Sequence, residues 1–205
     1  MLLKEKIIMQ EHEVAELDLA FKGDREYLHG TDIFNELVML MSPVEHIKFQ
    51  LKKIMTSQIS IIRLGDRQES RQKISGIFKF MHKKNEIELG LFENSKKINR
   101  RYEYNEEEVI RDVIYTKDKA ELHSSTKYSF IERLVSLNKS MLVRFVEQPS
   151  VKWYFTQIDI TRLPADDCSL SLSIKQQLGI RLVLSNIVAN GVKIGSIGFS
   201  GVVEE

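Results

Sequence analysis

The sequence predicts an α+β protein built from two copies of one unit, in which a strand precedes a helix and several strands follow it. Two observations predict this fold class. A local sequence pattern occurs twice in the same order, and the apolar residues after each predicted helix change from helical spacing to alternation. We expect a first unit over residues 1–93, a connection over residues 94–107 and a second unit over residues 108–205.

The repeated pattern lies in two successive segments. Residues 18–29 (DLAFKGDREYLH) match residues 112–123 (DVIYTKDKAELH), with identical Asp, Leu and His positions. Further along, residues 33–40 (IFNELVML) match residues 130–137 (FIERLVSL). Two matches in the same order, with a slightly longer loop in the second copy, favour internal duplication over chance.

Strands are expected on both sides of each helix. One strand precedes each helix, at about residues 12–22 and about residues 108–117. Alternating apolar residues indicate further strands in four later ranges: 44–64, 73–92, 152–163 and 170–203. Within the last range, Asn190-Gly191 is a strong signal for a hairpin turn.

The two helices are predicted from apolar residues that recur three or four positions apart. This spacing occurs at about residues 32–41 and about residues 129–146. Asp32 is the expected N-cap of the first helix, and Ser129 with Glu132 fits a capping box at the start of the second.

Composition argues against several classes of function. Lys plus Arg is 30 and Asp plus Glu is 29, so the net charge of +1 gives no reason to expect nucleic acid or an anionic membrane as a partner. The one cysteine, Cys168, excludes a disulfide framework and fits a reducing compartment. Early charges interrupt the apolar N-terminus, and no apolar run approaches the roughly 20 residues of a membrane helix. We therefore expect a soluble, cytoplasmic protein.

Cofactor signals are also missing from the sequence. It has no phosphate-binding loop and no dinucleotide fingerprint, and its histidines lack the spacing of metal ligands. We therefore expect neither a cofactor nor a metal site.

The unit order and two local patterns resemble the hot-dog superfamily, in which an antiparallel sheet wraps a long helix. Asp24 and His29 are similar to the aspartate and histidine of MaoC-like enoyl hydratases, although the Asn-Pro pair inside that motif is absent, and Asp118 and His123 repeat the spacing. Alternatively, Leu28-His29-Gly30 before an amphipathic helix resembles the His-Gly that opens the central helix of hot-dog thioesterases, with Thr31 in place of the second glycine. The two motifs place the histidine differently, so at most one applies.

The resemblance implies an acyl-thioester site around the first helix. His29 would donate or remove a proton, and Gly30 would let a thioester approach the free N–H groups of the helix N-terminus. Asp32 and Glu36 would orient a base or activate water, or else be an N-cap and a solvated helix residue. Tyr27 is a candidate substrate contact, with simple packing as its alternative.

In the second copy, His123 corresponds to His29, and Glu132 is the acid of the second helix. Paired hot-dog units commonly share their sites. The resemblance therefore implies two composite sites, His29 with Glu132 and His123 with Glu36. The alternative is that the second copy is purely structural.

Three functions stay open at this point. The first is a hot-dog dehydratase/hydratase or thioesterase acting on acyl-CoA or acyl carrier protein conjugates, as in fatty acid or polyketide metabolism. The second is a non-catalytic double hot-dog protein that binds an acyl group or a protein partner. The third is an unrelated duplicated protein with a structural or interaction role. Assembly as a homodimer is compatible with each of these.

Overall fold

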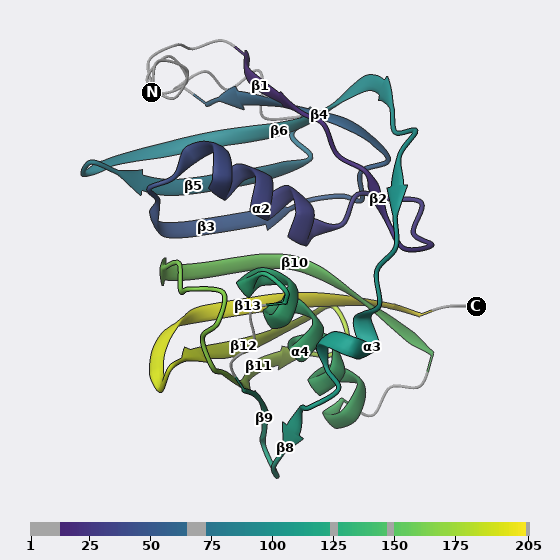
Figure 1. The fold of residues 1–205 in the computed structure, drawn as a ribbon, viewed down its shortest axis with the longest axis vertical. Coiled ribbons are helices and arrows are strands. Elements are labelled where there is room, and N and C mark those ends of the chain that lie inside the picture. Colours follow the sequence, from purple (N-terminus) through teal and green to yellow (C-terminus); the bar gives the residue numbers. More distant parts are fainter. Residues whose placement is uncertain (1–12, 65–72, 124–126, 147–149, 204–205) are drawn as a thin grey trace. The chain divides into compact units, whose positions relative to one another are not determined.

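The computed structural model describes residues 13–64, 73–123, 127–146 and 150–203. The chain divides into two compact units, Met1–Tyr104 and Asn105–Glu205 (Figure 1). The boundary between them falls within the stretch where the sequence suggests a connection, and the exact domain limits stay a prediction.

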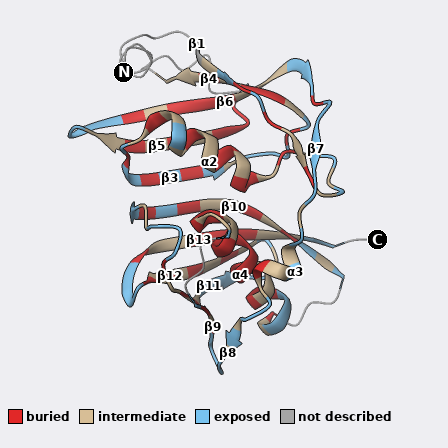
Figure 2. Cartoon of the chain, in the orientation of Figure 1, coloured by how far each residue is buried: buried red, intermediate tan, exposed pale blue. Residues whose placement is uncertain are grey.

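In the first unit, helix α2 (Gly30–Met41) packs on an antiparallel sheet whose strands lie in the order β1-β4-β6-β5-β3. The bounds of these strands are β1 Glu13–Leu17, β4 Ser57–Arg63, β6 Asn85–Lys97, β5 Gly76–His82 and β3 Glu45–Leu51. The ring of Phe34 on the helix meets those of Phe49 and Phe78 on the sheet edge to face, with centroids 5.7 and 6.2 Å apart. Buried residues recur along α2 and alternate with less buried residues along β3 and β5 (Figure 2), as expected for a helix packed on one face of a sheet.

Local sequence explains where α2 ends. Ser42 is extended, as proline favours in the residue before it, and its N–H and hydroxyl both donate to the carbonyl oxygen of Val38, at 2.9 and 2.6 Å. Pro43 cannot continue the helix because it has no N–H.

A short parallel ribbon positions the chain ahead of α2. Strand β2 (Phe21–Lys22) pairs with β7 (Arg101–Tyr102), so the segment just before the helix lies beside the end of the first unit. Gly23 follows β2 with a φ of +58°, a conformation that side chains rarely adopt and that turns the chain toward the helix.

In the second unit, helix α4 (Phe130–Phe145) contacts an antiparallel sheet with the strand order β10-β13-β12-β11-β9-β8. The remaining bounds are α3 Glu106–Val109, β8 Ile114–Tyr115, β9 Lys119–Leu122, β10 Val151–Arg162, β11 Leu170–Leu178, β12 Leu182–Ala189 and β13 Val192–Val203. Asn190 and Gly191, with φ of 48° and 75°, form the predicted turn between β12 and β13.

Each unit therefore consists of one main helix against an antiparallel sheet, which is the hot-dog arrangement. The predicted α+β class is confirmed, and both helices lie within two residues of their predicted limits. Among the described residues, no helix has the length and apolar character needed to cross a membrane.

Two sequence predictions about local structure were wrong. The strand expected at 108–117 is largely replaced by α3 and a turn, because the Asn105 side chain accepts hydrogen bonds from the N–H groups of Glu107 and Glu108 and so starts a helix. Acidic residues in that first turn favour the same outcome. The strand expected at 12–22 is divided into β1 and β2.

The N-cap prediction for α2 was also wrong. The N-cap is His29, and Asp32 lies inside the first helical turn. Lys22 and Tyr102 bind the Asp32 carboxylate, which therefore serves a contact with distant residues instead of capping the helix.

Candidate functional site

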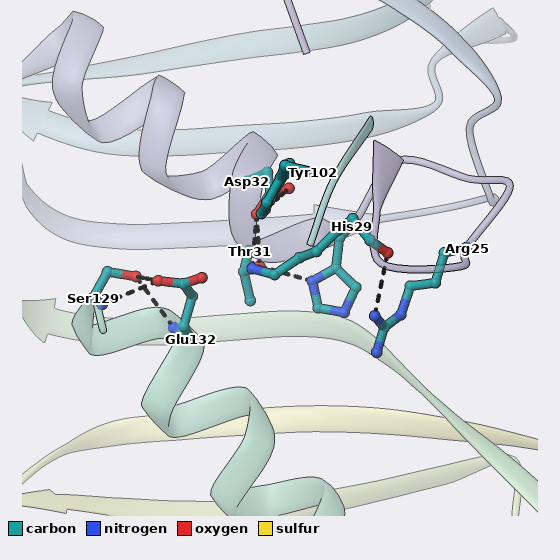
Figure 3. Close-up of polar contacts among 8 residues, drawn as sticks. Arg25, His29, Thr31, Asp32, Tyr102, Ser129 and Glu132 are labelled. Atoms are coloured by element: carbon teal, nitrogen blue, oxygen red, sulfur yellow. Dashed lines mark hydrogen bonds and ion pairs between the residues drawn. The ribbon is translucent and has the colours of Figure 1, made fainter. Parts of the chain in front are cut away.

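The residues at the N-terminal end of α2 form a polar network within the first unit (Figure 3). His29 is extended, with φ −79° and ψ 132°, and makes no side-chain capping bond to the helix. Its ring turns instead toward Thr31, with Nδ1 2.7 Å from the Thr31 hydroxyl oxygen. The same hydroxyl lies 3.1 Å from Oδ1 of Asp32, to which it can donate. The histidine is thus linked to a carboxylate through one hydroxyl group.

The Thr31 hydroxyl has one proton and two neighbours that can accept it, Oδ1 of Asp32 and Nδ1 of His29. Its oxygen also accepts a hydrogen bond from the Lys22 ammonium at 3.1 Å. When the hydroxyl donates to Asp32, Nδ1–H of His29 donates to the Thr31 oxygen, and Nε2 is then the basic nitrogen of His29.

A buried cation completes the network. Lys22 has no exposed surface, and its ammonium lies 3.0 Å from Oδ1 of Asp32. The other carboxylate oxygen accepts a hydrogen bond from the Tyr102 hydroxyl at 2.7 Å. The ring of Tyr104 covers the ammonium at 4.0 Å from its centroid, and the ring of Tyr102 lies 5.8 Å away.

The start of α2 keeps backbone donors that its own capping does not use. Among the described residues, the backbone N–H groups of Gly30 and Thr31 make no hydrogen bond, although both residues are buried. Helix N-termini with unsatisfied N–H groups favour a carbonyl oxygen or a developing negative charge.

The start of α4, considered by itself, has the opposite character. Ser129 and Glu132 form the predicted capping box, in which the Ser129 hydroxyl accepts from Glu132 N–H and the Glu132 carboxylate accepts from Ser129 N–H at 3.1 Å. The N–H of Phe130 donates to the Asp166 carboxylate at 2.6 Å. Glu132 therefore serves the helix cap, a role that the sequence also suggests.

His123 is not the structural counterpart of His29. It follows β9, whereas Ser129 occupies the N-cap place that His29 holds in the first unit. The sequence pairing of these two histidines was therefore wrong. The physical reason is that the residues between β9 and α4 lengthen the approach to the helix, so the repeated Leu-His pair ends a strand instead of opening a helix. Internal duplication stays a prediction.

His123 instead lines a small polar pocket of about 160 Å³ in the second unit. Glu108, Tyr128 and Arg133 line the same pocket. Burial raises the pKa of the Tyr128 phenol, and a hydrogen bond from Lys127 lowers the pKa of Glu108. The pocket is charged, unlike the apolar cavity that an acyl chain requires.

Arg133, which lines this pocket, is a buried side chain that links several segments of the second unit. It is 1% exposed, and its guanidinium donates to the carbonyl oxygens of His123, Asp166 and Cys168. Desolvation lowers the pKa of Arg133 and raises that of the Cys168 thiol. Arg133 thus joins the end of β9 to the loop before β11.

The remaining candidates from the sequence have simpler surroundings. Glu36 is half-buried in the second turn of α2, and Tyr27 is half-buried in the loop before the helix. The composite pairs His29 with Glu132 and His123 with Glu36 stay predictions. Within the described ranges, no cluster of three or more metal-ligating side chains is found.

Sequence reasoning missed Lys22, Tyr102 and Tyr104. They come from segments about 80 residues apart, and the parallel pairing of β2 with β7 brings them together. One signal was available, because Tyr102 and Tyr104 alternate along the chain and so face the same side of an extended segment.

Comparison with known proteins gives similarity only at the level of structure. No family model matches the sequence, and no curated protein matches it. An acyl-ACP thioesterase from Bacteroides thetaiotaomicron aligns with 8% identity over 90% of this chain and 96% of its own, at a TM-score of 0.46. A 12:0-ACP thioesterase from Umbellularia californica aligns with 6% identity over 93% and 96%, at 0.45.

A third similar structure is an erythromycin dehydratase, with 8% identity over 87% of this chain and 82% of its own, at a TM-score of 0.45. The hot-dog assignment rests on the element order and strand pairing of each unit.

Proposed function

We propose that the protein acts on an acyl thioester at the N-terminal end of α2, with His29 as the general base. The observation that carries this proposal is the bond between His29 Nδ1 and the Thr31 hydroxyl, next to the N–H groups of Gly30 and Thr31, which no other described residue uses. A base and a pair of carbonyl-polarising donors are the two groups that acyl transfer requires.

Each group has a defined role in the proposed chemistry. The thioester carbonyl oxygen accepts hydrogen bonds from the N–H groups of Gly30 and Thr31, where the helix dipole also favours the negative charge that develops on oxygen. His29 Nε2 takes a proton from water as the water oxygen bonds to the carbonyl carbon. The carbon–sulfur bond then breaks, and the thiolate leaves with that proton as a free thiol.

Hydrolysis is the reaction that these residues favour. Dehydration of a 3-hydroxyacyl thioester needs an acid for the departing hydroxyl group as well as a base for the α-proton. The nearest carboxylate, Asp32, is ion-paired with Lys22 and bonded to Tyr102, which suits it to a fixed anionic role. Dehydration or hydration is therefore the alternative outcome of the test.

The first unit is the better candidate for the site because of the contrast between the two helix starts. At α4, the capping box and Asp166 use the donors that a thioester would need. We place the reacting carbonyl at α2 and give the second unit no catalytic role.

The test is a panel of acyl-CoA and acyl carrier protein thioesters of different chain lengths. Thiol release reports hydrolysis, and the absorbance of the conjugated enoyl thioester reports dehydration or hydration. We expect His29→Gln to lower the rate by roughly 10²–10⁴-fold, because it removes the base. His82→Gln is the matched control, since His82 lies at the end of β5 in the same unit, and its Nδ1 lies 3.1 Å from the Pro43 carbonyl oxygen, to which it can only donate, outside the network.

Three results would count against the proposal. An unchanged rate in His29→Gln would show that His29 is not the general base. Binding of acyl thioesters without turnover would favour a non-catalytic binding protein. Neither turnover nor binding by the wild type would leave a structural or interaction role.

A further inference from the structure

Lys22 is an unusual residue for the place it occupies. It lies on the two-residue strand β2, has no exposed surface, and points its ammonium at the first turn of α2. A buried ammonium is costly unless it is paired and hydrogen-bonded. Here the Asp32 carboxylate, the Thr31 hydroxyl and the Tyr104 ring provide that compensation.

The chain of contacts from Lys22 to His29 has a direction. The ammonium can only donate, and an ionised carboxylate can only accept. Lys22 and Tyr102 both donate to the Asp32 carboxylate. An ionised carboxylate is a stronger acceptor than a neutral imidazole nitrogen, which favours donation of the Thr31 proton to Asp32. Thr31 then has acceptor capacity toward His29, which favours the ring proton on Nδ1.

We propose that Lys22 is a positioning residue that fixes the tautomer of His29 by keeping Asp32 anionic and so setting the direction of the Asp32–Thr31–His29 hydrogen bonds. Lys22 itself does not touch the substrate in this role. The proposal rests on the function assigned to His29 above, and it identifies what makes Nε2 the basic nitrogen.

Removing the Lys22 ammonium should reverse the direction of the hydrogen bonds that link Asp32, Thr31 and His29. Without Lys22, a carboxylate that is only 14% exposed loses its ion pair and is favoured to take a proton from solvent. Protonated Asp32 then donates to the Thr31 oxygen, and the Thr31 hydroxyl donates to Nδ1 of His29. Nδ1 loses its proton and Nε2 gains one through solvent, so the nitrogen proposed as the base is blocked.

The experiment is ¹⁵N NMR of the full-length protein with labelled histidine, at a pH where the imidazole is neutral. The chemical shifts of the two ring nitrogens report which one carries the proton. We expect Nδ1–H in the wild type and a shift toward Nε2–H in Lys22→Met. Lys52→Met, the same change at an exposed lysine of the same unit, should leave the wild-type tautomer unchanged.

A second pair of variants keeps the test decisive if Lys22→Met does not fold. Thr31→Val has almost the same shape but no hydroxyl, so it cuts the link and should release His29 from the Nδ1–H form. Thr31→Ser keeps the hydroxyl and should restore that form. An unchanged tautomer in Thr31→Val, or in a folded Lys22→Met, overturns the proposal.

The same variants separate this proposal from the proposed function. A tautomer change in Lys22→Met, together with a wild type that turns over no thioester, would support the role of Lys22 and contradict the enzymatic role. Turnover that depends on His29, together with a His29 tautomer that is unchanged in Lys22→Met, would support the proposed function and contradict the role of Lys22. If both hold, Lys22→Met should lower turnover and Lys22→Arg, which keeps the charge, should recover part of it.

Discussion

The two main helices begin in different ways. Ser129 and Glu132 close the start of α4 with reciprocal hydrogen bonds, and Asp166 takes a further N–H group. At the start of α2, His29 supplies no cap, and the donors of Gly30 and Thr31 remain unused within the described residues. The N-cap position is thus closed by side-chain hydrogen bonds in α4, whereas in α2 it leaves two backbone N–H groups unused among the described residues.

The buried cations beside these helices differ in the same way. Arg133 donates to three carbonyl oxygens and holds loops together. Lys22 pairs with a carboxylate that leads through Thr31 to His29. A guanidinium with several fixed donors suits cross-linking of the backbone, whereas a compact ammonium suits charge compensation of one carboxylate.

The largest expected effect is on the buried ion pair. Lys22→Met should lower the free energy of unfolding by roughly 3–5 kcal/mol, because Asp32 loses its buried ion-pair partner and must take up a proton or stay charged without that partner. Urea unfolding measures this change. The double variant Lys22→Met/Asp32→Asn should recover much of the loss. If the loss of unfolding free energy in the double variant equals the sum of the losses in the two single variants, Lys22 and Asp32 are not energetically coupled.

The next prediction concerns the cores beneath the two helices, where the units should behave alike. Leu37 and Leu134 are both fully buried. Leu37→Ala and Leu134→Ala should each cost roughly 2–5 kcal/mol, from lost apolar burial and the cavity that remains. Thermal melts of both variants, compared with Met39→Ala at an exposed position of α2, give the measurement. A loss near zero at either site would contradict the packing of that helix.

The smallest expected effect is on stability when the N-cap residues of the two main helices are changed. It tests the difference between the two helix starts directly. Ser129→Ala should destabilise the protein by about 1 kcal/mol, because it removes a side-chain cap. His29→Ser should raise stability by about 0.5–1 kcal/mol, because it supplies a cap that α2 lacks. Chemical unfolding of both variants tests the pair, and equal destabilisation by the two changes would show that α2 is already capped.

The sequence was most informative where structure is local. Apolar spacing located both helices, the Ser129 and Glu132 pattern predicted the capping box, and Asn190-Gly191 predicted the hairpin turn. In each case the interacting groups lie within a few residues of one another. Their contacts therefore follow from backbone geometry alone.

The candidate site was only half visible in the sequence. His29 and Gly30 are recognisable because they open an amphipathic helix. Lys22 is not, because a lysine in a short strand normally faces solvent, and here contacts with α2 and with the segment around β7 bury it. Local similarity was also not enough to place the repeated segment. The residues around His123 resemble those around His29 in sequence, yet they lie at the end of strand β9.

Thiol release from acyl thioesters by His29→Ser and Ser129→Ala tests the central claim most directly. Both variants change the N-cap residue of a main helix, one in each unit. We predict that His29→Ser loses turnover by roughly 10²–10⁴-fold while staying folded, because the base is gone and the new cap can accept from the Thr31 N–H group, one of the two proposed donors. Ser129→Ala should keep the wild-type rate. Equal rates in both variants, or a loss confined to Ser129→Ala, would contradict the assignment of the site to α2.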